Sequence, residues 1–302
     1  MPPILVTGST GNVGAAVVRA LSASETEVRS AVRPGQRPAS GSTVPFDFQE
    51  PVTWAPAFDG VRSMFLVRPP ALGNVKRDLL PAVAAAREAG VRHVVLLSLQ
   101  GAQRNKIVPH ATVESWLRHS GLDWTFVRAS FFHQNLTTTH VADIRDRDQV
   151  VVPAGRGATA FVDAEDVGAV AAAALLDAPA HTGRAWTVTG PRALTYAEIA
   201  DILTVELGRP IRYTRPGILR YARHARRELD LPVGMVAVTS AIYTAARLGL
   251  AAGLSDDVRT VLGRAPVDFA DFAHRERGAW ERAVAPSTDS LTPRTSAQGR
   301  SA

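Results

Sequence analysis

The stretch ILVTGSTGNVG, residues 4–14, decides the fold, because an apolar run ends at Thr7 and gives way to glycines at 8, 11 and 14. A helical apolar pattern follows over 13–21. A strand that ends in such a loop and feeds a helix brings backbone N–H groups and a positive helix terminus to one point. This context predicts the diphosphate site of a dinucleotide, and a plain strand-turn-helix corner is the alternative. The residues predicted to contact the cofactor here are Gly8, Ser9, Thr10, Gly11, Asn12, Val13 and Gly14.

Runs rich in Val, Ile and Leu alternate with Ala-rich amphipathic stretches along the first part of the chain, as in βαβ units. Strands are predicted over 4–7, 27–32, 64–67, 93–98 and 124–128, and helices over 13–21, 75–89 and 112–119. The alternation predicts an α/β fold with a Rossmann-like, doubly wound parallel sheet that carries helices on both faces.

The pattern changes after about residue 130, where two short strand-like pieces occur, QVVVP (149–153) and RAWTVTG (184–190). We expect these pieces to complete the sheet edge and to build a small C-terminal substrate lid from interleaved segments. The predicted organisation is an NAD(P)-binding Rossmann-like domain over 1–150, then the remaining sheet edge and a mainly helical lid over 151–284. The tail over 285–302 lacks apolar periodicity and is predicted to be disordered.

Composition narrows the possible classes of protein. The 302 residues contain no cysteine, which excludes disulfides, thiolate metal sites and a cysteine nucleophile. The eight histidines show no metal-ligand spacing, so we expect no metal site. The net charge is +6, but the one dense basic cluster, 215–227, is interpreted as a solvated face rather than a nucleic-acid site. Polar residues interrupt the apolar stretch 232–252 and no signal peptide is visible, which favours a cytoplasmic protein that does not interact with membranes.

The residue that selects the dinucleotide is predicted at the end of the second strand, where NAD-binding folds place a carboxylate on the ribose. This chain has Arg33 there, with Arg37 just after it and no acid. A guanidinium can bind the 2′-phosphate that a carboxylate would repel. The pattern therefore favours NADP(H) over NAD(H), with an Arg-rich surface loop as the alternative.

The spacing G-x-x-G-x-x-G is similar to that of atypical short-chain dehydrogenases/reductases, and longer stretches resemble their NmrA-like branch. These stretches are FDFQEP (46–51), MFLVRPP (64–70), VRHVVLLSLQGA (91–102), VESWLRHSGLDWTFVRASFFHQNL (113–136) and GLSDDVRTVLGRAPVDFADFAHRERGAW (253–280). Within that branch the chain most resembles NADPH-dependent quinone and azo-dye reductases. The branch also includes proteins that bind the dinucleotide as a redox sensor and catalyse nothing.

The resemblance also implies positions for the rest of the cofactor site. It places Asp47 and Phe48 beside the adenine, and Val67, Arg68 and Pro69 under the adenosine ribose and phosphates. It places Ser98 and the segment 129–132 near the nicotinamide.

The Tyr-x-x-x-Lys motif of typical short-chain reductases is missing. The four tyrosines are followed four residues later by Ala, Gly, Ala and Arg. At the corresponding place in the helix after the fifth strand the chain has His110, with Glu114 one turn later. His110 is the candidate catalytic residue, as a proton donor or as a ligand of the nicotinamide carboxamide, with Glu114 holding its ring. A structural histidine at a helix start is the alternative, and Lys106 is a weaker candidate for the ribose.

Without a strong proton donor, reduction of a simple ketone would leave its alkoxide poorly stabilised. A quinone accepts hydride more readily because its oxyanion is delocalised, and positioning then supplies most of the catalysis. Phe131, Phe132 and Asn135 follow the sixth strand and are predicted to contact the acceptor. We therefore expect an NAD(P)H-dependent reductase of the quinone reductase type that acts on a small conjugated acceptor, as a monomer or homodimer. The alternative is an NADP(H)-sensing regulatory protein of the NmrA type.

Overall fold

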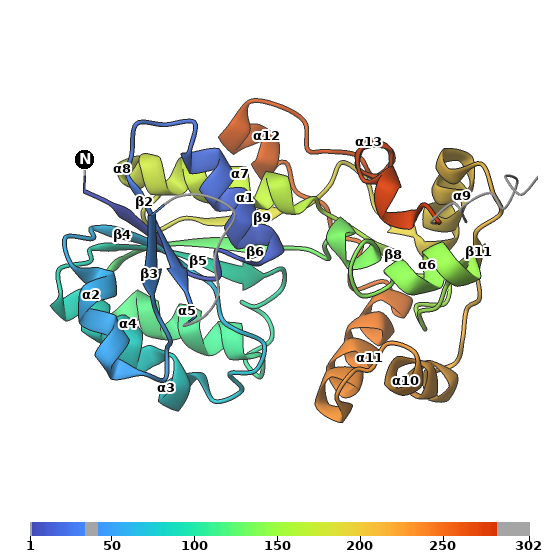
Figure 1. Cartoon of the computed structure of the whole chain (residues 1–302), viewed down its shortest axis with the longest axis horizontal. Helices are drawn as coiled ribbons and strands as arrows, with labels where there is room; N and C mark the ends of the chain where they lie inside the picture. Colours follow the sequence, from blue (N-terminus) through green and yellow to red (C-terminus); the bar gives the residue numbers. More distant parts are fainter. Residues whose placement is uncertain (1, 34–41, 283–302) are drawn as a thin grey trace, which may run out of the picture.

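A parallel seven-stranded sheet forms the centre of the larger of two lobes (Figure 1), in the order β3-β2-β1-β4-β5-β6-β9. The computed structural model describes residues 2–33 and 42–282, so Arg37 and the tail 285–302 lie outside the described residues. The strands are β1 (Ile4–Val6), β2 (Val28–Val32), β3 (Ser42–Pro45), β4 (Ser63–Leu66), β5 (His93–Leu99), β6 (Asp123–Ala129) and β9 (Ala185–Val188). Strands β1 to β3 are added toward one edge of the sheet, and the strands from β4 onward are added toward the other edge. This change of direction leaves a crevice at the carboxyl ends of β1 and β4.

Helices cover both faces of this sheet, which confirms the predicted Rossmann-like, doubly wound α/β fold. One face carries α2 (Trp54–Phe58), α3 (Val75–Asp78), α4 (Leu80–Glu88) and α5 (Pro109–His119). The other face carries α1 (Asn12–Leu21), α7 (Ala164–Leu176), α8 (Ala178–His181) and α12 (Asp257–Leu262). Each face has its own apolar core, because strands that are covered on both sides present apolar side chains to both faces.

The single long helix predicted over 75–89 is wrong, since the structure has α3 and α4 with a break at Leu79. Pro81 lies in the first turn of α4 and has no N–H to continue the hydrogen-bond ladder of α3. A proline in the first turn of a helix is favourable, so Pro81 indicates that a second helix begins within the apolar pattern.

A second lobe is built around a separate aromatic core. It contains α6 (Val141–Arg147), β7 (Gln149–Val150), β8 (Ala158–Thr159), β10 (Leu194–Thr195), α9 (Tyr196–Leu207), β11 (Arg212–Tyr213), α10 (Ile218–Arg227), α11 (Val233–Arg247) and α13 (Phe269–Arg275). Short 3-10 turns complete the chain at Pro51–Thr53, His133–Leu136 and Arg277–Trp280. All four tyrosines of the chain pack in this core.

The two strand-like pieces expected to complete the sheet edge and to build the lid lie in different lobes. QVVVP does not join the main sheet: β7 pairs with β11 in the second lobe, because its alternate valines Val150 and Val152 are buried in the second core. RAWTVTG does complete the sheet, as β9 beside β6. Asp143, in α6 just before this segment, is fully buried and binds Arg147 and His224.

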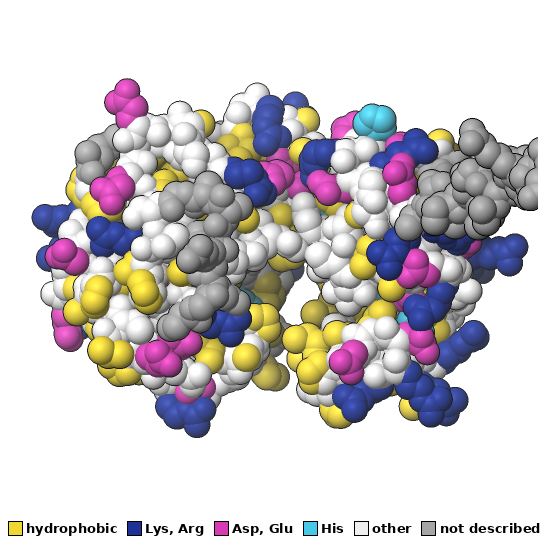
Figure 2. Space-filling model, in the orientation of Figure 1, with side chains coloured by type: hydrophobic (Ala, Val, Ile, Leu, Met, Phe, Trp, Pro, Cys, Tyr) yellow, Lys and Arg dark blue, Asp and Glu magenta, His cyan; other side chains and the backbone are white. Residues whose placement is uncertain are grey.

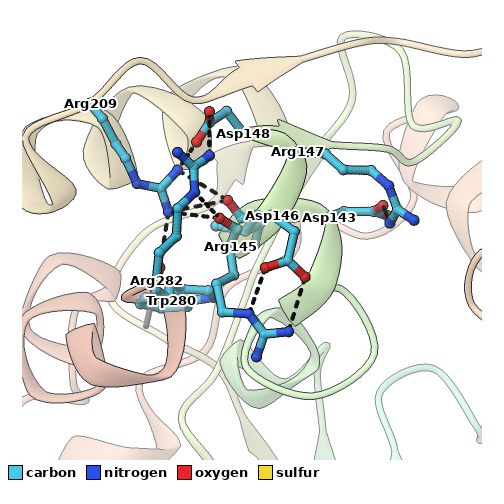
Figure 3. A network of polar contacts seen from close by, with 9 residues as sticks. Asp143, Arg145, Asp146, Arg147, Asp148, Arg209, Trp280 and Arg282 are labelled. Carbon is cyan, nitrogen blue, oxygen red and sulfur yellow. Dashed lines mark hydrogen bonds and ion pairs between the residues drawn. The ribbon is translucent and has the colours of Figure 1, made fainter. Parts of the chain in front are cut away.

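The neighbouring acids of the second lobe are held in an ion-pair network (Figure 3). Asp146 binds the adjacent Arg145, and Asp148 binds both Arg209 and Arg282. Arg209 also donates to the Trp280 carbonyl, at 2.9 Å. The network therefore connects the carboxyl end of α6 to the segment that contains Trp280 and Arg282.

Candidate functional site

The glycine loop lies at the carboxyl end of β1 and is fixed by the side chains around it. Thr7 Oγ1 donates to the Phe65 carbonyl and accepts the Val67 N–H, both at 2.9 Å, so the loop is tied to the end of β4. Gly8 has φ +63°, a left-handed conformation that favours glycine. The turn closes with the Gly11 N–H donating to the Gly8 carbonyl at 3.0 Å.

Gly14 determines how close the helix comes to the loop. A Cβ at this position would lie 2.1 Å from the Gly8 carbonyl oxygen, so only glycine lets α1 start directly against the turn. The first turn of α1 has no side-chain cap, which leaves its backbone N–H groups as donors for an anion. This cradle fits a diphosphate, because it offers oriented N–H groups and lacks the side-chain atoms that would fill it.

The predicted loop residues differ in what their side chains can offer. Ser9 is buried and its hydroxyl donates to the Ala31 carbonyl at 2.9 Å, so it anchors the loop to β2. Val13 is buried in the sheet core. Thr10 and Asn12 are exposed at the loop surface. Backbone groups at Ser9 and Val13, and side chains at Thr10 and Asn12, are therefore what a cofactor could touch.

The residues expected near the adenosine follow β2, β3 and β4. Arg33 directly follows β2 and is exposed. The Asp47 carboxylate accepts the Gln49 N–H at 2.8 Å, which shapes the turn after β3. Phe48 is buried and packs edge-on against Phe46 with 4.8 Å between ring centroids, so its ring supports this turn from the core. Contact of these three residues with a nucleotide stays a prediction.

Arg68 is the unusual group at the end of β4. Its Nη1 donates to the carbonyls of Pro69, Pro70 and Leu72, which shapes the turn, while its Nε is buried without a partner. Among the described residues no carboxylate lies within ion-pair distance of this guanidinium. Burial lowers the pKa of Arg68 from its ordinary value. Val67 lies against Gly8, so Arg68 stands beside the predicted diphosphate cradle.

Ser98, Glu114 and Arg128 form a buried polar cluster under the ends of β5 and β6. The Ser98 hydroxyl donates to Glu114 Oε1 at 2.7 Å. Arg128 donates from Nε and Nη2 to the two oxygens of the same carboxylate, at 2.9 and 2.6 Å. Glu114 and Arg128 are only 3% and 7% exposed, so the pair is desolvated and held in one geometry. The cluster fixes α5 to the sheet.

His110 lies in the first turn of α5, directly after Pro109. The expectation that Glu114 holds its ring is wrong, because the hydrogen bonds of Glu114 go to Ser98 and Arg128. Burial and the nearby positive charge of Arg68 lower the pKa of His110 to about 4. The imidazole is therefore neutral near pH 7 and is a hydrogen-bonding group rather than an acid.

The orientation of the His110 ring follows from which nitrogen is enclosed. Nδ1 is buried without a partner, whereas Nε2 is not sealed from solvent. A buried N–H without a partner is costlier than an unpaired acceptor, so the proton belongs on Nε2. His110 thus presents an N–H donor on its open side. Lys106 is exposed in the loop before α5.

A cleft separates the two lobes below the point where they join (Figure 2), and the carboxyl edge of the sheet faces the second lobe. Phe131 packs against Phe161 and Tyr243 on the second-lobe side. Phe132 packs on the sheet side and bridges to Val162. Asn135 is partly exposed in the 3-10 turn that follows these two residues. The three predicted acceptor residues therefore lie where the chain crosses between lobes.

The sequence interpretation missed α11 as part of the site. This helix faces the main lobe across the cleft (Figure 1), and it exposes Val238 and Ile242, which are 53% and 41% accessible. Its opposite side is buried through Val236 and Tyr243. The apolar character of the stretch 232–252 was the only sequence signal for this helix. It did not show that one apolar face would be buried and another exposed. Gln100, directly after β5, donates to the carbonyl of Gly253, in the segment between α11 and α12, at 2.7 Å.

A profile of the NmrA-like family matches residues 2–220. The chain belongs to the NmrA-like family. One NmrA-like relative, the NAD(P)H azoreductase of Xenophilus azovorans, is 35% identical over 289 residues, covering 92% of this chain and 99% of the azoreductase. Within the described ranges of this NmrA-like chain, no helix combines the length and apolar character that crossing a bilayer requires. The same ranges contain no cluster of three or more metal-ligating side chains.

Solved structures share the NmrA-like fold. The NADPH-dependent quinone oxidoreductase of Escherichia coli, solved with NADPH, matches with a TM-score of 0.78 and 21% identity, over 90% of this chain and 99% of that one. The negative transcriptional regulator NmrA, solved with NADP, matches with a TM-score of 0.68 and 18% identity, over 90% and 94% of the two chains. At these identities the structures establish a common fold.

Proposed function

We propose that this chain is an NADP(H)-dependent oxidoreductase that delivers hydride to a small, conjugated, electron-poor acceptor such as a quinone or an azo compound. The observation that carries the proposal is the close approach of α1 to the glycine loop after β1, which a Cβ at Gly14 would prevent by lying 2.1 Å from the Gly8 carbonyl oxygen. The 35% identity to an NAD(P)H azoreductase over nearly the full length of both chains supports the same class of reaction.

The two lobes would bind different partners, the main lobe the cofactor and the second lobe the acceptor. When bound, the nicotinamide nucleotide would supply the hydride. The glycine loop would hold its diphosphate, Arg33 its 2′-phosphate, and the turn 67–69 its ribose. The Nε2–H of neutral His110 would bind the carboxamide or the acceptor. Phe131, Val238 and Ile242 would give a planar acceptor an apolar surface across the cleft, so the second lobe would act as the lid.

The acceptor class follows from the protonation state of the site. The chain lacks Tyr-x-x-x-Lys, and His110 is neutral, so neither would protonate a strongly basic alkoxide. Reduction of a quinone yields a weakly basic, delocalised oxyanion that water can protonate. Positioning of donor and acceptor face to face is then the main contribution of the protein.

Stopped-flow measurement of NADPH oxidation with a panel of quinones, azo dyes and simple ketones tests this proposal. We expect turnover with the first two groups and little with the ketones. The Gly14→Ala variant serves as the control for oxidation outside the cradle. Absence of NADPH oxidation above that control with every acceptor would contradict the proposal.

A second candidate function is sensing of NADP(H) with a partner contact as output. The missing Tyr-x-x-x-Lys motif favours it, as does the structural likeness to the regulator NmrA. Calorimetry that shows tight binding of NADP(H) by a protein inactive with the whole acceptor panel would support sensing over reduction.

A further inference from the structure

The strongest unexplained feature is the positive charge of Arg68, which no carboxylate balances. Three carbonyls bind its Nη1, and its Nε is buried without a partner. Its Nη2 makes no hydrogen bond to the described residues and is not sealed from solvent. A half-buried guanidinium in this state has an unused donor and an uncompensated charge, both of which suit an anion.

The surroundings of Arg68 indicate which anion. Arg68 follows the end of β4, and His110 lies in the first turn of α5, the helix that follows the neighbouring strand β5, so both residues lie at the carboxyl edge of the sheet. The charge of Arg68 also contributes to the lowered pKa of His110. His110 presents Nε2–H on its open side, as argued above. Two N–H donors, one of them charged, therefore lie at the same edge of the sheet, and His110 occupies the position where typical short-chain reductases have their tyrosine.

We propose that Arg68 Nη2 and His110 Nε2–H form a donor pair that stabilises the negative charge developing on the acceptor during reduction. This inference rests on the proposed function and goes beyond a backbone role for Arg68. The hydride forms a new bond at one end of the conjugated acceptor, and the displaced π pair moves to the oxygen or nitrogen at the other end. That atom faces the donor pair and then takes a proton from water, while NADPH is oxidised to NADP⁺.

The charge is fixed before the reaction, because Arg68 stays protonated throughout and its turn holds it in place. Preorganised donors of this kind are more effective than water, which must reorient as charge develops. The pair would replace the missing Tyr-x-x-x-Lys by stabilising the anion rather than by protonating it. The arrangement also explains why acceptors with delocalised anions would be preferred.

The test uses 4-nitrophenol as a probe for oxyanion binding, with the protein saturated with NADP⁺ so that no reduction can occur. The visible absorbance of the phenolate reports its ionisation when bound. We expect wild-type protein to bind the phenolate in preference to the phenol, which lowers the apparent pKa of the bound probe. Arg68→Gln is expected to weaken phenolate binding by about tenfold to a hundredfold, the usual loss for a charge-assisted hydrogen bond. Arg68→Lys, which keeps the charge, is expected to retain most of the preference.

Arg29 supplies a matched control. It also donates to three backbone carbonyls, those of Pro56, Ala57 and Asp59, but from the amino-terminal part of β2. Arg29→Gln removes a similar carbonyl clamp and is expected to leave phenolate binding unchanged. The NADPH dissociation constant of Arg68→Gln is measured by fluorescence titration, because Arg68 also shapes the turn 67–69 that would hold the ribose.

Three outcomes would overturn the inference. The first is wild-type protein that shows no preference for the phenolate, which decides the matter even if Arg68→Gln fails to fold. The second is an Arg68→Gln protein that loses NADPH affinity but keeps the phenolate preference, because the guanidinium would then serve the dinucleotide. The third is equal loss in Arg68→Gln and Arg29→Gln. Turnover of wild-type protein with quinones is scored separately, so failure of the proposed function remains distinguishable.

Discussion

The Arg128 guanidinium grips both oxygens of the Glu114 carboxylate, at 2.9 and 2.6 Å, and so joins β6 to α5 directly beneath the candidate site. Ser98 adds a third hydrogen bond to the same carboxylate. A buried pair of this kind contributes little net stability compared with apolar residues, but it is costly to break. Its role here is to hold α5, and with it His110, in one position relative to the strand ends.

Glu114→Gln is expected to lower the free energy of unfolding by about 3 kcal/mol, because it leaves Arg128 buried without a countercharge. Urea unfolding monitored by circular dichroism measures the change. Asp146→Asn removes one member of an exposed pair with Arg145 and is expected to change little. Equal stability of the two variants would show that the Glu114 pair does not hold α5.

Gly14→Ala is expected to weaken NADPH binding by about a hundredfold, because the added Cβ would push α1 away from the Gly8 carbonyl. Fluorescence titration with NADPH measures the loss. Gly278→Ala is the control, since a Cβ there would meet nothing within 4 Å. Unchanged affinity in Gly14→Ala would mean that the diphosphate is not held at this helix terminus.

Arg33→Gln is expected to weaken NADPH binding by about tenfold and to leave NADH binding unchanged, because only NADPH carries the 2′-phosphate. Calorimetry with both nucleotides measures the two affinities. Arg62→Gln, another exposed arginine, is a control for the loss of one positive charge. A parallel loss of both affinities in Arg33→Gln would contradict the assigned cofactor selectivity.

His110→Asn is expected to lower kcat for a quinone by about tenfold, because the shorter asparagine amide does not reach the position of the Nε2–H donor. The pH profile between about 5.5 and 8 is expected to keep its shape, since the pKa of His110 is about 4 and the ring is neutral throughout this range. If wild-type activity instead fell as pH rose through about 6.5, and His110→Asn removed that limb, His110 would be a proton donor.

Stability is expected to fall as the pH drops from about 6.5 toward 4. Burial lowers the pKa of four histidines, His93, His110, His133 and His140, to about 4 from 6.5. Between these values the unfolded chain binds more protons than the folded protein, so unfolding takes up about four protons in the middle of the window. Above pH 6.5 this penalty is absent. Urea unfolding at several pH values measures the slope.

Two histidine variants check that slope. His140→Gln is expected to remove about one proton from the uptake, although it also loses the 2.8 Å hydrogen bond to Tyr243. His119→Gln, which alters an exposed histidine, is expected to leave the slope unchanged. A slope that does not differ between the two variants would show that buried histidines do not set the acid sensitivity.

The sheet and its glycine loop could be predicted because both depend on local sequence. The central strands β1 and β5 are apolar at most positions, and Gly14 is required by atoms only six residues away. The sequence did not show which of the two later strand-like pieces joins the main sheet, because an apolar run indicates that a strand is buried but not which strand it pairs with. The burial of Asp143 has no local signal for the same reason, since its partner His224 is 81 residues away.

The predicted site was less complete because its chemistry depends on long-range contacts. His110 and Glu114 are one turn apart on the same helix, but the Glu114 carboxylate binds Arg128 of β6 instead of His110. The neutral state of His110 depends on burial and on Arg68, neither of which has a local signal. The exposed apolar face of α11 became recognisable only once the second lobe had placed that helix opposite the strand edge.

The chain crosses between the lobes repeatedly, since α7, β9 and α12 return to the sheet after segments of the second lobe. An exchange of contiguous halves between two NmrA-like proteins would therefore divide the main sheet. The sheet would lose β9 or one of the helices that cover it. Redesign of selectivity in this protein has to proceed by grafting single surfaces such as α11 onto an unbroken chain.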